Sequence, residues 1–269
     1  MLGSLVIIYP AAYEGGELAL RHKDREWKFD ANSLTVSQPS TSLAYVAFYS
    51  DIEHEVLEVT SGRRVTITYN LYLVNPVLKP EASTVAPDLK SISNLQTTLC
   101  GLLRSPELIP SGGTLGFGLA HLYPITFEMK LQELEAYLKG EDAHVYRACR
   151  ELWLQPSLRM IHDDEDSNGD YGIMLDQIVE DPEYSCYDNT YEGALIGDMG
   201  GVSVNLGNDI SIESSDRGTQ GESITWVSPL NERNQLQAIK RSYDYKMGFG
   251  RTYCRPCIIV PIPAASDRV

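Results

Sequence analysis

Six short apolar segments, separated by turn residues, fill the first 75 residues of the sequence, and no helical pattern lies between them. The segment "SLVIIYP" is rich in β-branched residues and ends at a proline, and "RRVTITYNLYLV" alternates along much of its length. Short strands at such close spacing favour a sandwich or jelly roll and argue against a βαβ fold. The segment "SLAYVAFYS" is nearly all apolar, so we expect this strand to be buried on both faces.

The rest of the chain is organised differently. Loop signals dominate residues 76–113, which we interpret as a linker wrapped around one short helix. Residues 114–269 contain two helical patterns and then strand-like segments. We expect them to form a helical pair and a C-terminal β region that pack on the β core of residues 1–75. The predicted fold is therefore mainly β (α+β), with a helical insertion and additional C-terminal strands.

The two helical patterns have recognisable stripes and ends. Leu131, Leu134 and Leu138 form an apolar stripe in the first pattern, "TFEMKLQELEAYLKG". In the second, "EDAHVYRACRELWL", Asp142 is the expected N-cap. The histidine of this second helix and His162 flank the helical region, and we expect both at the surface.

Composition excludes some classes of partner. The formal net charge is -15 and the isoelectric point is near 4.7, which argues against nucleic acid and against an anionic membrane surface. No segment approaches the roughly 20 apolar residues that a transmembrane helix needs, and the N-terminus lacks the basic region of a signal peptide. Five scattered cysteines indicate reduced thiols, so we predict a cytoplasmic protein.

One histidine and one arginine form the most informative constellation. In "HEVLEVTSGRRVTIT", Arg64 lies ten residues after His54, across a turn that contains Gly62. Strand alternation places Arg64, Thr66 and Thr68 on one face, where the two threonines would line a small polar pocket with the arginine. Two interpretations follow: a metal ligand with a distant carboxylate clamp, or an exposed turn histidine beside two surface arginines.

A family resemblance bears on this choice. The chain resembles a family of fungal proteins with a prolyl-4-hydroxylase-like Fe(II)/2-oxoglutarate-dependent dioxygenase domain, through the segments "GSLVIIYPAAYEGGELALRH", "YVAFYSDIEHEVLEVTSGRRVTITYNLY", "GGTLGFGLAHLYP" and "CIIVPIP". The resemblance implies a double-stranded β-helix (jelly roll). It also implies that His54 is the distal Fe(II) ligand, that Arg64 binds the cosubstrate 2-oxoglutarate, and that Tyr9 hydrogen-bonds it. Thr66 is a further candidate cosubstrate contact.

The sequence departs from the family pattern at its start. In the family, a His-x-Asp pair supplies two iron ligands on a strand before the segment that matches "GSLVIIYP". This sequence begins with that segment, so we expect an N-terminally incomplete β-helix. His22 and Asp24 form a literal His-x-Asp and are candidate substitutes; the other interpretation of "RHKDRE" is a solvated hairpin. Asp51 and Glu53 are further carboxylates near His54 in sequence.

The resulting functional hypothesis is a dioxygenase-like protein that hydroxylates an unknown substrate, a small molecule or a peptide, while 2-oxoglutarate becomes succinate and CO2. Loss of the His-x-Asp ligands would impair this activity. The alternative is a non-catalytic binding or scaffold protein that retains the fold. An incomplete jelly roll also leaves an open sheet edge, through which a homodimer could form.

Three other motifs favour structural roles. "DEDSNGDYGIML" opens like a calcium loop but has Leu175 where a glutamate should close it, so we interpret it as a hydrated acidic turn. The "CRPC" pair, Cys254 and Cys257, precedes a strand-like run and is expected to pack as two small side chains. "GGTLGFGLAH" lacks the spacing of a nucleotide-binding loop; His121 within it is a possible pocket residue.

Overall fold

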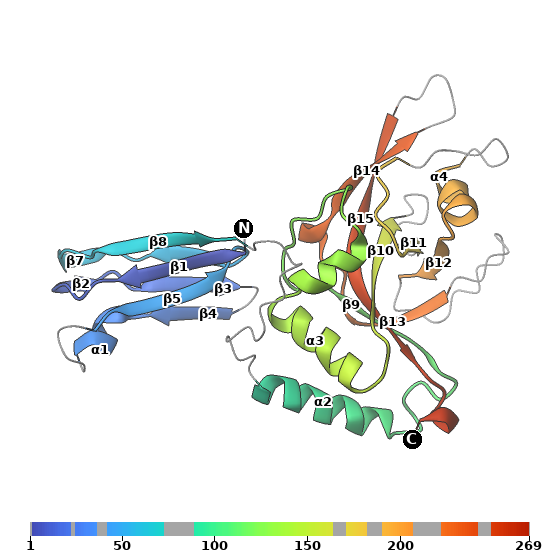
Figure 1. The fold of residues 1–269 in the computed structure, drawn as a ribbon, viewed down its shortest axis with the longest axis horizontal. Helices are drawn as coiled ribbons and strands as arrows, with labels where there is room; N and C mark the ends of the chain where they lie inside the picture. Colours follow the sequence, from blue (N-terminus) through green and yellow to red (C-terminus); the bar gives the residue numbers. More distant parts are fainter. Residues whose placement is uncertain are drawn as a thin grey trace. The chain divides into compact units, whose positions relative to one another are not determined.

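The chain forms two compact units, Met1–Ala82 and Ser83–Val269. The computed structural model describes residues 2–22, 25–36, 42–72, 89–163, 171–181, 190–206, 222–241 and 249–268 (Figure 1). The helix that the sequence places in a linker belongs to the second unit, where Leu99 packs into the main hydrophobic core.

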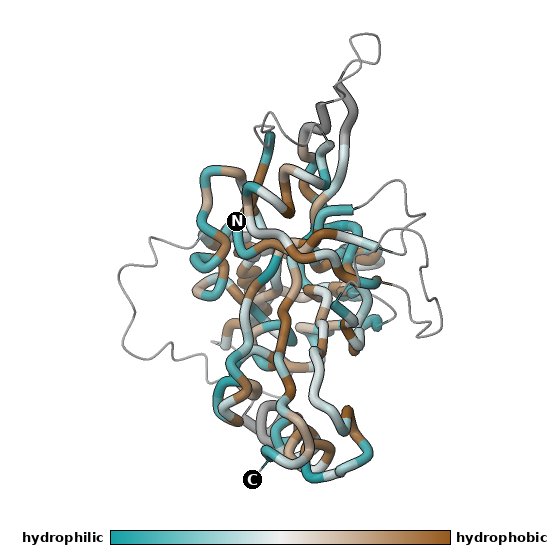
Figure 2. The backbone as a smooth tube through the Cα atoms, turned by 90° about the vertical axis from the view of Figure 1, so that its right-hand side faces the viewer, coloured by the Kyte–Doolittle hydropathy of each residue, from teal (hydrophilic) through white to brown (hydrophobic). Residues whose placement is uncertain are grey.

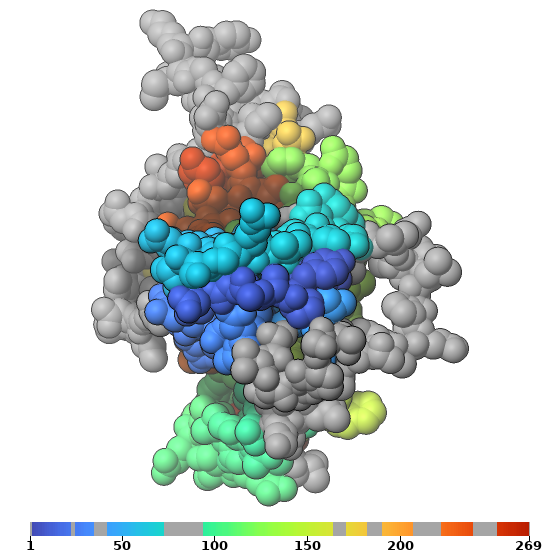
Figure 3. All heavy atoms as spheres, turned by 90° about the vertical axis from the view of Figure 1, so that its left-hand side faces the viewer, coloured from blue at the N-terminus to red at the C-terminus, as the bar shows by residue number. Residues whose placement is uncertain are grey.

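The first unit is built from two antiparallel three-stranded sheets in its described residues, with strand orders β5-β1-β8 and β4-β3-β6; a two-stranded ladder pairs β2 with β7. Its elements are β1 (Gly3–Ile8), β2 (Tyr13–Gly15), β3 (Leu18–His22), β4 (Arg25–Phe29), α1 (Ala31–Val36), β5 (Ala44–Tyr49), β6 (Glu53–Val56), β7 (Val59–Gly62) and β8 (Thr66–Leu71). The chain passes repeatedly from one sheet to the other, and Figure 3 shows β8 (cyan) alongside β1 (dark blue).

The core of the first unit lies between the two sheets. Val6 and Ile8 of β1 are buried with Ala31 and Ala44, and partly buried aromatic residues, among them Phe29 of β4, pack against them. Alternation along each strand assigns these residues to the inner faces. Two residues that pair directly across a ladder lie on the same face of the sheet. The register of each ladder therefore shows which residues of the neighbouring strands also face the core.

The outer faces of the two sheets differ. On the β4-β3-β6 sheet, Arg21 is exposed and pairs with Glu26 and Glu55 at 3.0 and 3.1 Å. On the β5-β1-β8 sheet, the outward residues are apolar, and Tyr45 is 70% exposed. The prediction that "SLAYVAFYS" is buried on both faces is therefore wrong, because no described element of this unit covers the second face.

The second unit contains a closed mixed sheet. In the described residues, strands β10-β11-β12-β13-β9-β15 follow in order, β10 also pairs with β15, and β14 adds to β15. The β12–β13 and β13–β9 ladders are parallel and the others antiparallel. The strands are β9 (Gly113–Gly118), β10 (Ser157–Asp163), β11 (Tyr171–Leu175), β12 (Val202–Asn205), β13 (Glu222–Ser228), β14 (Leu236–Arg241) and β15 (Phe249–Ile262).

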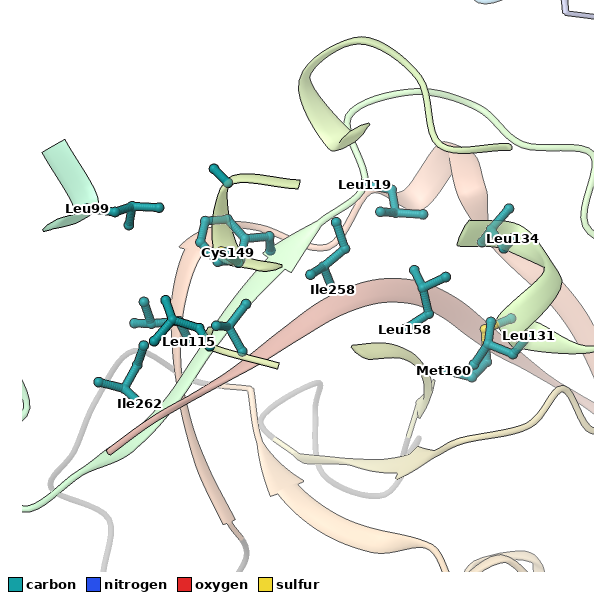
Figure 4. Close-up of a cluster of buried hydrophobic side chains, with 14 of the residues drawn as sticks. Leu99, Leu115, Leu119, Leu131, Leu134, Cys149, Leu158, Met160, Ile258 and Ile262 are labelled. Carbon is teal, nitrogen blue, oxygen red and sulfur yellow. The ribbon is translucent and has the colours of Figure 1, made fainter. Parts of the chain in front are cut away.

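The second unit also contains helices, several of which pack on the sheet from outside. They are α2 (Leu89–Leu103), η1 (Leu131–Tyr137), α3 (Gly140–Glu151), α4 (Tyr191–Gly193), η3 (Ala194–Asp198), η4 (Glu232–Asn234) and η5 (Ala265–Asp267). Along β15, Ile258 faces the core under α2, η1 and α3 (Figure 4), and Val260 belongs to the same cluster. Cys257 and Ile259 belong to a separate cluster that includes residues of β10 to β13. Figure 2 shows hydrophobic (brown) and hydrophilic (teal) residues alternating along the backbone. The C-terminal strands thus form a closed sheet with its own core.

The mainly β prediction is confirmed, but several local predictions need correction. The first helical stripe is a short 3-10 helix, η1, in which Leu131 and Leu134 are buried as expected. Asp142 is not the N-cap: α3 is capped at Lys139, and the Asp142 carboxylate instead accepts hydrogen bonds from the 120–123 segment. His162 is fully buried on β10, because its strand lies in the interior of the unit.

The structural interpretations of the other motifs agree with their environments where these are described. "CRPC" lies within β15 and both cysteines are buried; burial raises the pKa of Cys254 to about 12 and also raises the pKa of Cys257. Residues 164–170, which hold most of the acidic loop, lie outside the described residues. In the described part of the chain, none of the helices combines the length and apolar character needed to cross a membrane.

Candidate functional site

His54 lies on the inner face of the first unit, at the open side of the sandwich. It is directly opposite Leu20 in the β3–β6 ladder, and Leu20 shares its face with Leu18, which is paired with the core residue Phe29. Its ring centroid lies 4.8 Å from that of Phe48, which reaches the same space from the other sheet. His54 is nevertheless exposed, because β6 is an edge strand in the described residues.

The orientation of the His54 ring suits a ligand role. Nδ1 lies 3.3 Å from the carbonyl oxygen of Ile52. If Nδ1 carries the proton and donates it to that carbonyl, the lone pair of Nε2 can bind a metal ion. In that tautomer, Nε2 would be the ring nitrogen available to a metal ion.

Arg64 lies between β7 and β8 and has an unsatisfied donor. Its Nε is buried and has no hydrogen-bond partner among the described residues, whereas Arg63 beside it is exposed. Continuing the β1–β8 register beyond Thr66 assigns Arg64 to the inner side of the sheet, as the sequence alternation predicts. A buried N–H that lacks an acceptor costs about 1–3 kcal/mol, so an anion at this position would be stabilised.

Gly16 provides the space that the Arg64 side chain occupies. Its φ is +71°, and a Cβ at this position would lie 3.1 Å from Cδ of Arg64 and 2.9 Å from a methyl group of Val59. We predict that Gly16→Ala lowers the free energy of unfolding by about 1–2 kcal/mol through backbone strain, and also displaces the guanidinium. Urea unfolding measures the first effect. Gly101→Ala, on α2 with nothing within 4 Å of the new methyl group, is the matched control and should not destabilise the chain. Equal effects of the two substitutions would contradict this role for Gly16.

Thr66 and Tyr9 are placed differently by the β1–β8 register. Thr66 pairs with Ile8, so its hydroxyl lies on the inner face with that core residue. Tyr9 donates its backbone N–H to the carbonyl of Val65 at 3.0 Å, which continues the ladder by one residue. By alternation Tyr9 and Val65 lie on the outer face, and Tyr9 is 40% exposed. Thr66 and Tyr9 therefore lie on opposite faces of this sheet, and the extended alternation assigns Arg64 to the side of Thr66.

His22 lies at the end of β3 and approaches Asp51, which is distant in sequence. Its Nε2 is 3.9 Å from an Asp51 carboxylate oxygen, and both side chains are largely buried. His22 shares the inner face with Leu20, so it is a diagonal neighbour of His54 in the ladder. Asp24, the other half of the literal His-x-Asp, lies outside the described residues.

These residues do not assemble an iron site around His54. Fe(II) in oxygenases is held by two histidines and one carboxylate on one face. Among the described residues of this unit, no set of three His, Cys, Asp or Glu donors that includes His54 lies within 4.8 Å of one another. The donor types are suitable, but their placement does not fit Fe(II).

Comparison with known proteins adds no family assignment. No family model, curated protein or solved structure matches the chain. Functional inference therefore rests on the residues and their geometry.

Sequence reasoning identified His54, Arg64 and Thr66 as one group but missed two contacts. The aromatic contact of Phe48 with His54 joins strands of different sheets, and the approach of Asp51 to His22 depends on the turn before β6. The alternation of "AYVAFY" points Phe48 to the same side as Val46, which was the available signal for the first contact.

Proposed function

We propose that the first unit is a dioxygenase-like module that binds a dicarboxylate of the 2-oxoglutarate type on its inner face, with Arg64 as the carboxylate partner. The observation that carries this proposal is the buried and unpartnered Nε of Arg64. A guanidinium can present Nε–H and one Nη–H side by side to a carboxylate, which matches the geometry of a bidentate pair.

The surroundings of Arg64 support a small polar ligand. Thr66 and Thr68 pair with Ile8 and Val6, and so follow Arg64 along the inner face of β8. Their hydroxyl groups can donate to a second carboxylate or to a keto oxygen. The chain as a whole is strongly acidic and repels anions. A cationic side chain on this face would therefore be the local group that attracts an anion.

The strand order supports the dioxygenase-like fold. Strands β1, β5 and β8 form one sheet, and β3, β4 and β6 form the other. The chain therefore crosses between the two sheets after β1, β4, β5 and β6. Repeated crossing between two antiparallel sheets is the connectivity of Greek-key jelly rolls. We therefore propose that the first unit is a double-stranded β-helix.

The binding experiment is thermal unfolding with increasing 2-oxoglutarate in the presence of EDTA. We predict a concentration-dependent rise in Tm for the wild-type chain, since a ligand that binds only the folded state stabilises it. Arg64→Ala should abolish the rise, and Arg64→Lys should weaken it because an ammonium cannot form the bidentate pair. Arg63→Ala, the exposed neighbour, is the matched control and should leave the rise intact. A rise that is equal in the two alanine variants would rule out Arg64 as the binding residue.

An active Fe(II)/2-oxoglutarate dioxygenase is the second candidate function. Only the donor types favour it: His22, His54 and Asp51 supply two imidazoles and a carboxylate, but as placed they do not hold Fe(II), so this function requires them to move together. Anaerobic titration with Fe(II) and 2-oxoglutarate should then give a visible charge-transfer band that is lost in His54→Ala. Dicarboxylate binding in EDTA without such a band would identify a non-catalytic binding module.

A further inference from the structure

The outer face of the β5-β1-β8 sheet carries an uncharged, largely apolar surface, which we call the tyrosine face. The register aligns its residues in rows across the three strands: Tyr45, Ile7 and Ile67 in one row, and Ala47, Leu5 and Tyr69 in the next. Tyr9 and Val65 extend the surface beyond the strand ends. None of these side chains bears a charge at neutral pH.

This surface is exposed in the described structure. Tyr45 is 70% exposed, Tyr69 51%, Val65 49%, Tyr9 40% and Ile67 38%. The outer face of the other sheet carries the ion pairs of Arg21, as a solvent-facing surface should. Of the outer faces of these two sheets, only the tyrosine face has the composition of a buried surface. An exposed apolar patch of this kind indicates an interaction site.

We propose that the tyrosine face packs against the tyrosine face of a second copy of this chain, as a two-fold symmetric dimer. The exposed fractions of its five most accessible side chains leave on the order of 500 Å² of surface, given that a tyrosine buries about 150–250 Å² when fully covered. The half-buried Leu5 and Ile7 add to this surface. A stable interface needs about 600 Å² or more from each partner, so this face lies at the lower limit of what a dimer needs.

The distribution of charge is compatible with a second copy as the occupant. The chain has a net charge of -15, yet its tyrosine face is neutral, so two such faces can meet without bringing like charges into contact. A two-fold interface places the same patch on both partners, so an apolar face is matched by an apolar face. Two sheets pack face to face with aligned strands about 10 Å apart, a spacing that side chains of this size fill. Tyrosine hydroxyls can reach solvent at the rim of such an interface.

Sedimentation velocity of the full chain over a range of concentrations tests this proposal. The wild-type chain should dimerise, and added salt should strengthen the dimer by screening the repulsion between two acidic chains. Tyr45→Lys and Ile67→Lys, at opposite edges of the sheet, should each weaken dimerisation at least about tenfold, because each would bury an unpaired charge. Val227→Lys, which changes a 58% exposed residue of the second unit, is the control and should leave the dimer intact.

Far-UV circular dichroism checks the folding of each variant. If Ile67→Lys does not fold, Tyr45→Lys still tests the proposal, because Tyr45 is more exposed than Ile67. A wild-type chain that stays monomeric at all concentrations would overturn the proposal, and would indicate that another occupant covers the face. A dimer that persists unchanged in Tyr45→Lys would place the contact elsewhere, for example along the edge of β8. Neither result would bear on ligand binding at Arg64, which lies on the inner side of the sheet.

Discussion

Asp142→Ala is expected to lower the free energy of unfolding of the second unit by at least about 3 kcal/mol. The Asp142 carboxylate is buried near the start of α3 and accepts three hydrogen bonds: from the backbone N–H of Ala120 at 2.7 Å, from that of His121 at 3.0 Å and from the Tyr123 hydroxyl at 2.7 Å. Alanine would leave these donors unpaired, at about 1–3 kcal/mol for each. The loss is large enough to unfold a typical domain partially.

Asp142→Asn distinguishes the hydrogen bonds from packing. The asparagine amide keeps the shape of the side chain and one acceptor oxygen, but turns an N–H₂ group towards hydrogen-bond donors. We therefore expect a loss of stability smaller than that of Asp142→Ala. Arg147→Ala, at an exposed position of the same helix, is the control. Urea unfolding followed by circular dichroism measures all three. If Asp142→Ala and Arg147→Ala were equally stable, the buried carboxylate would not hold the 120–123 segment to α3.

The second large effect is a loss of stability on acidification that depends on His162. Its side chain is fully buried, Nδ1 lies 2.8 Å from the Tyr191 hydroxyl, and Nε2 has no partner among the described residues. Burial lowers the pKa of His162 to about 4. Protonation would place an N–H at Nε2 with no acceptor, so the folded chain resists it.

The unfolded chain binds this proton with a pKa of about 6.5, so it holds more protons than the folded chain between about pH 6.5 and pH 4. The contribution of His162 to stability is therefore fully present above that range and falls as the pH is lowered through it, by about 3 kcal/mol in all. Burial raises the pKa values of Asp142 and Asp163, which acts in the opposite direction, so a variant is needed to isolate the histidine.

His162→Gln cannot take up this proton. Urea unfolding at a series of pH values should show a smaller loss of stability on acidification for His162→Gln than for the wild-type chain. His144→Gln, at a half-buried position of α3, is measured alongside as a second histidine replacement. Parallel curves for the wild-type chain and His162→Gln would show that the buried histidine is not the acid-sensitive group.

Local pattern predicted the strands well because each short apolar segment carries its own alternation. The segment "SLVIIYP" becomes β1, and "RRVTITYNLYLV" contains β8, with the facing of Thr66 as the alternation indicates. Residue type alone placed Asp142 at a helix N-cap. It could not show that Lys139 takes that position while the carboxylate binds the 120–123 segment, some 20 residues away.

The candidate site was predictable only where it follows one strand. His54 and Arg64 were located from a motif and the alternation after it, whereas the separation of Tyr9 from Thr66 depends on the register between β1 and β8. The His22–Asp51 approach joins a strand end to a distant turn. Likewise, nothing in "SLAYVAFYS" shows that only one of its faces has a partner in the unit, because a two-sided apolar strand looks the same in sequence whether or not its second face is covered.

The dicarboxylate-binding role of Arg64 is tested most directly by the NMR signal of its Nε–H group. In a ¹⁵N-labelled chain, Arg64→Lys identifies this signal by its disappearance, and Arg63→Lys identifies that of the exposed neighbour. We predict that 2-oxoglutarate, added with EDTA, shifts the Arg64 signal progressively until it saturates and leaves the Arg63 signal in place, because the buried Nε gains its missing acceptor. An Arg64 signal that does not move at saturating 2-oxoglutarate would contradict the proposed site.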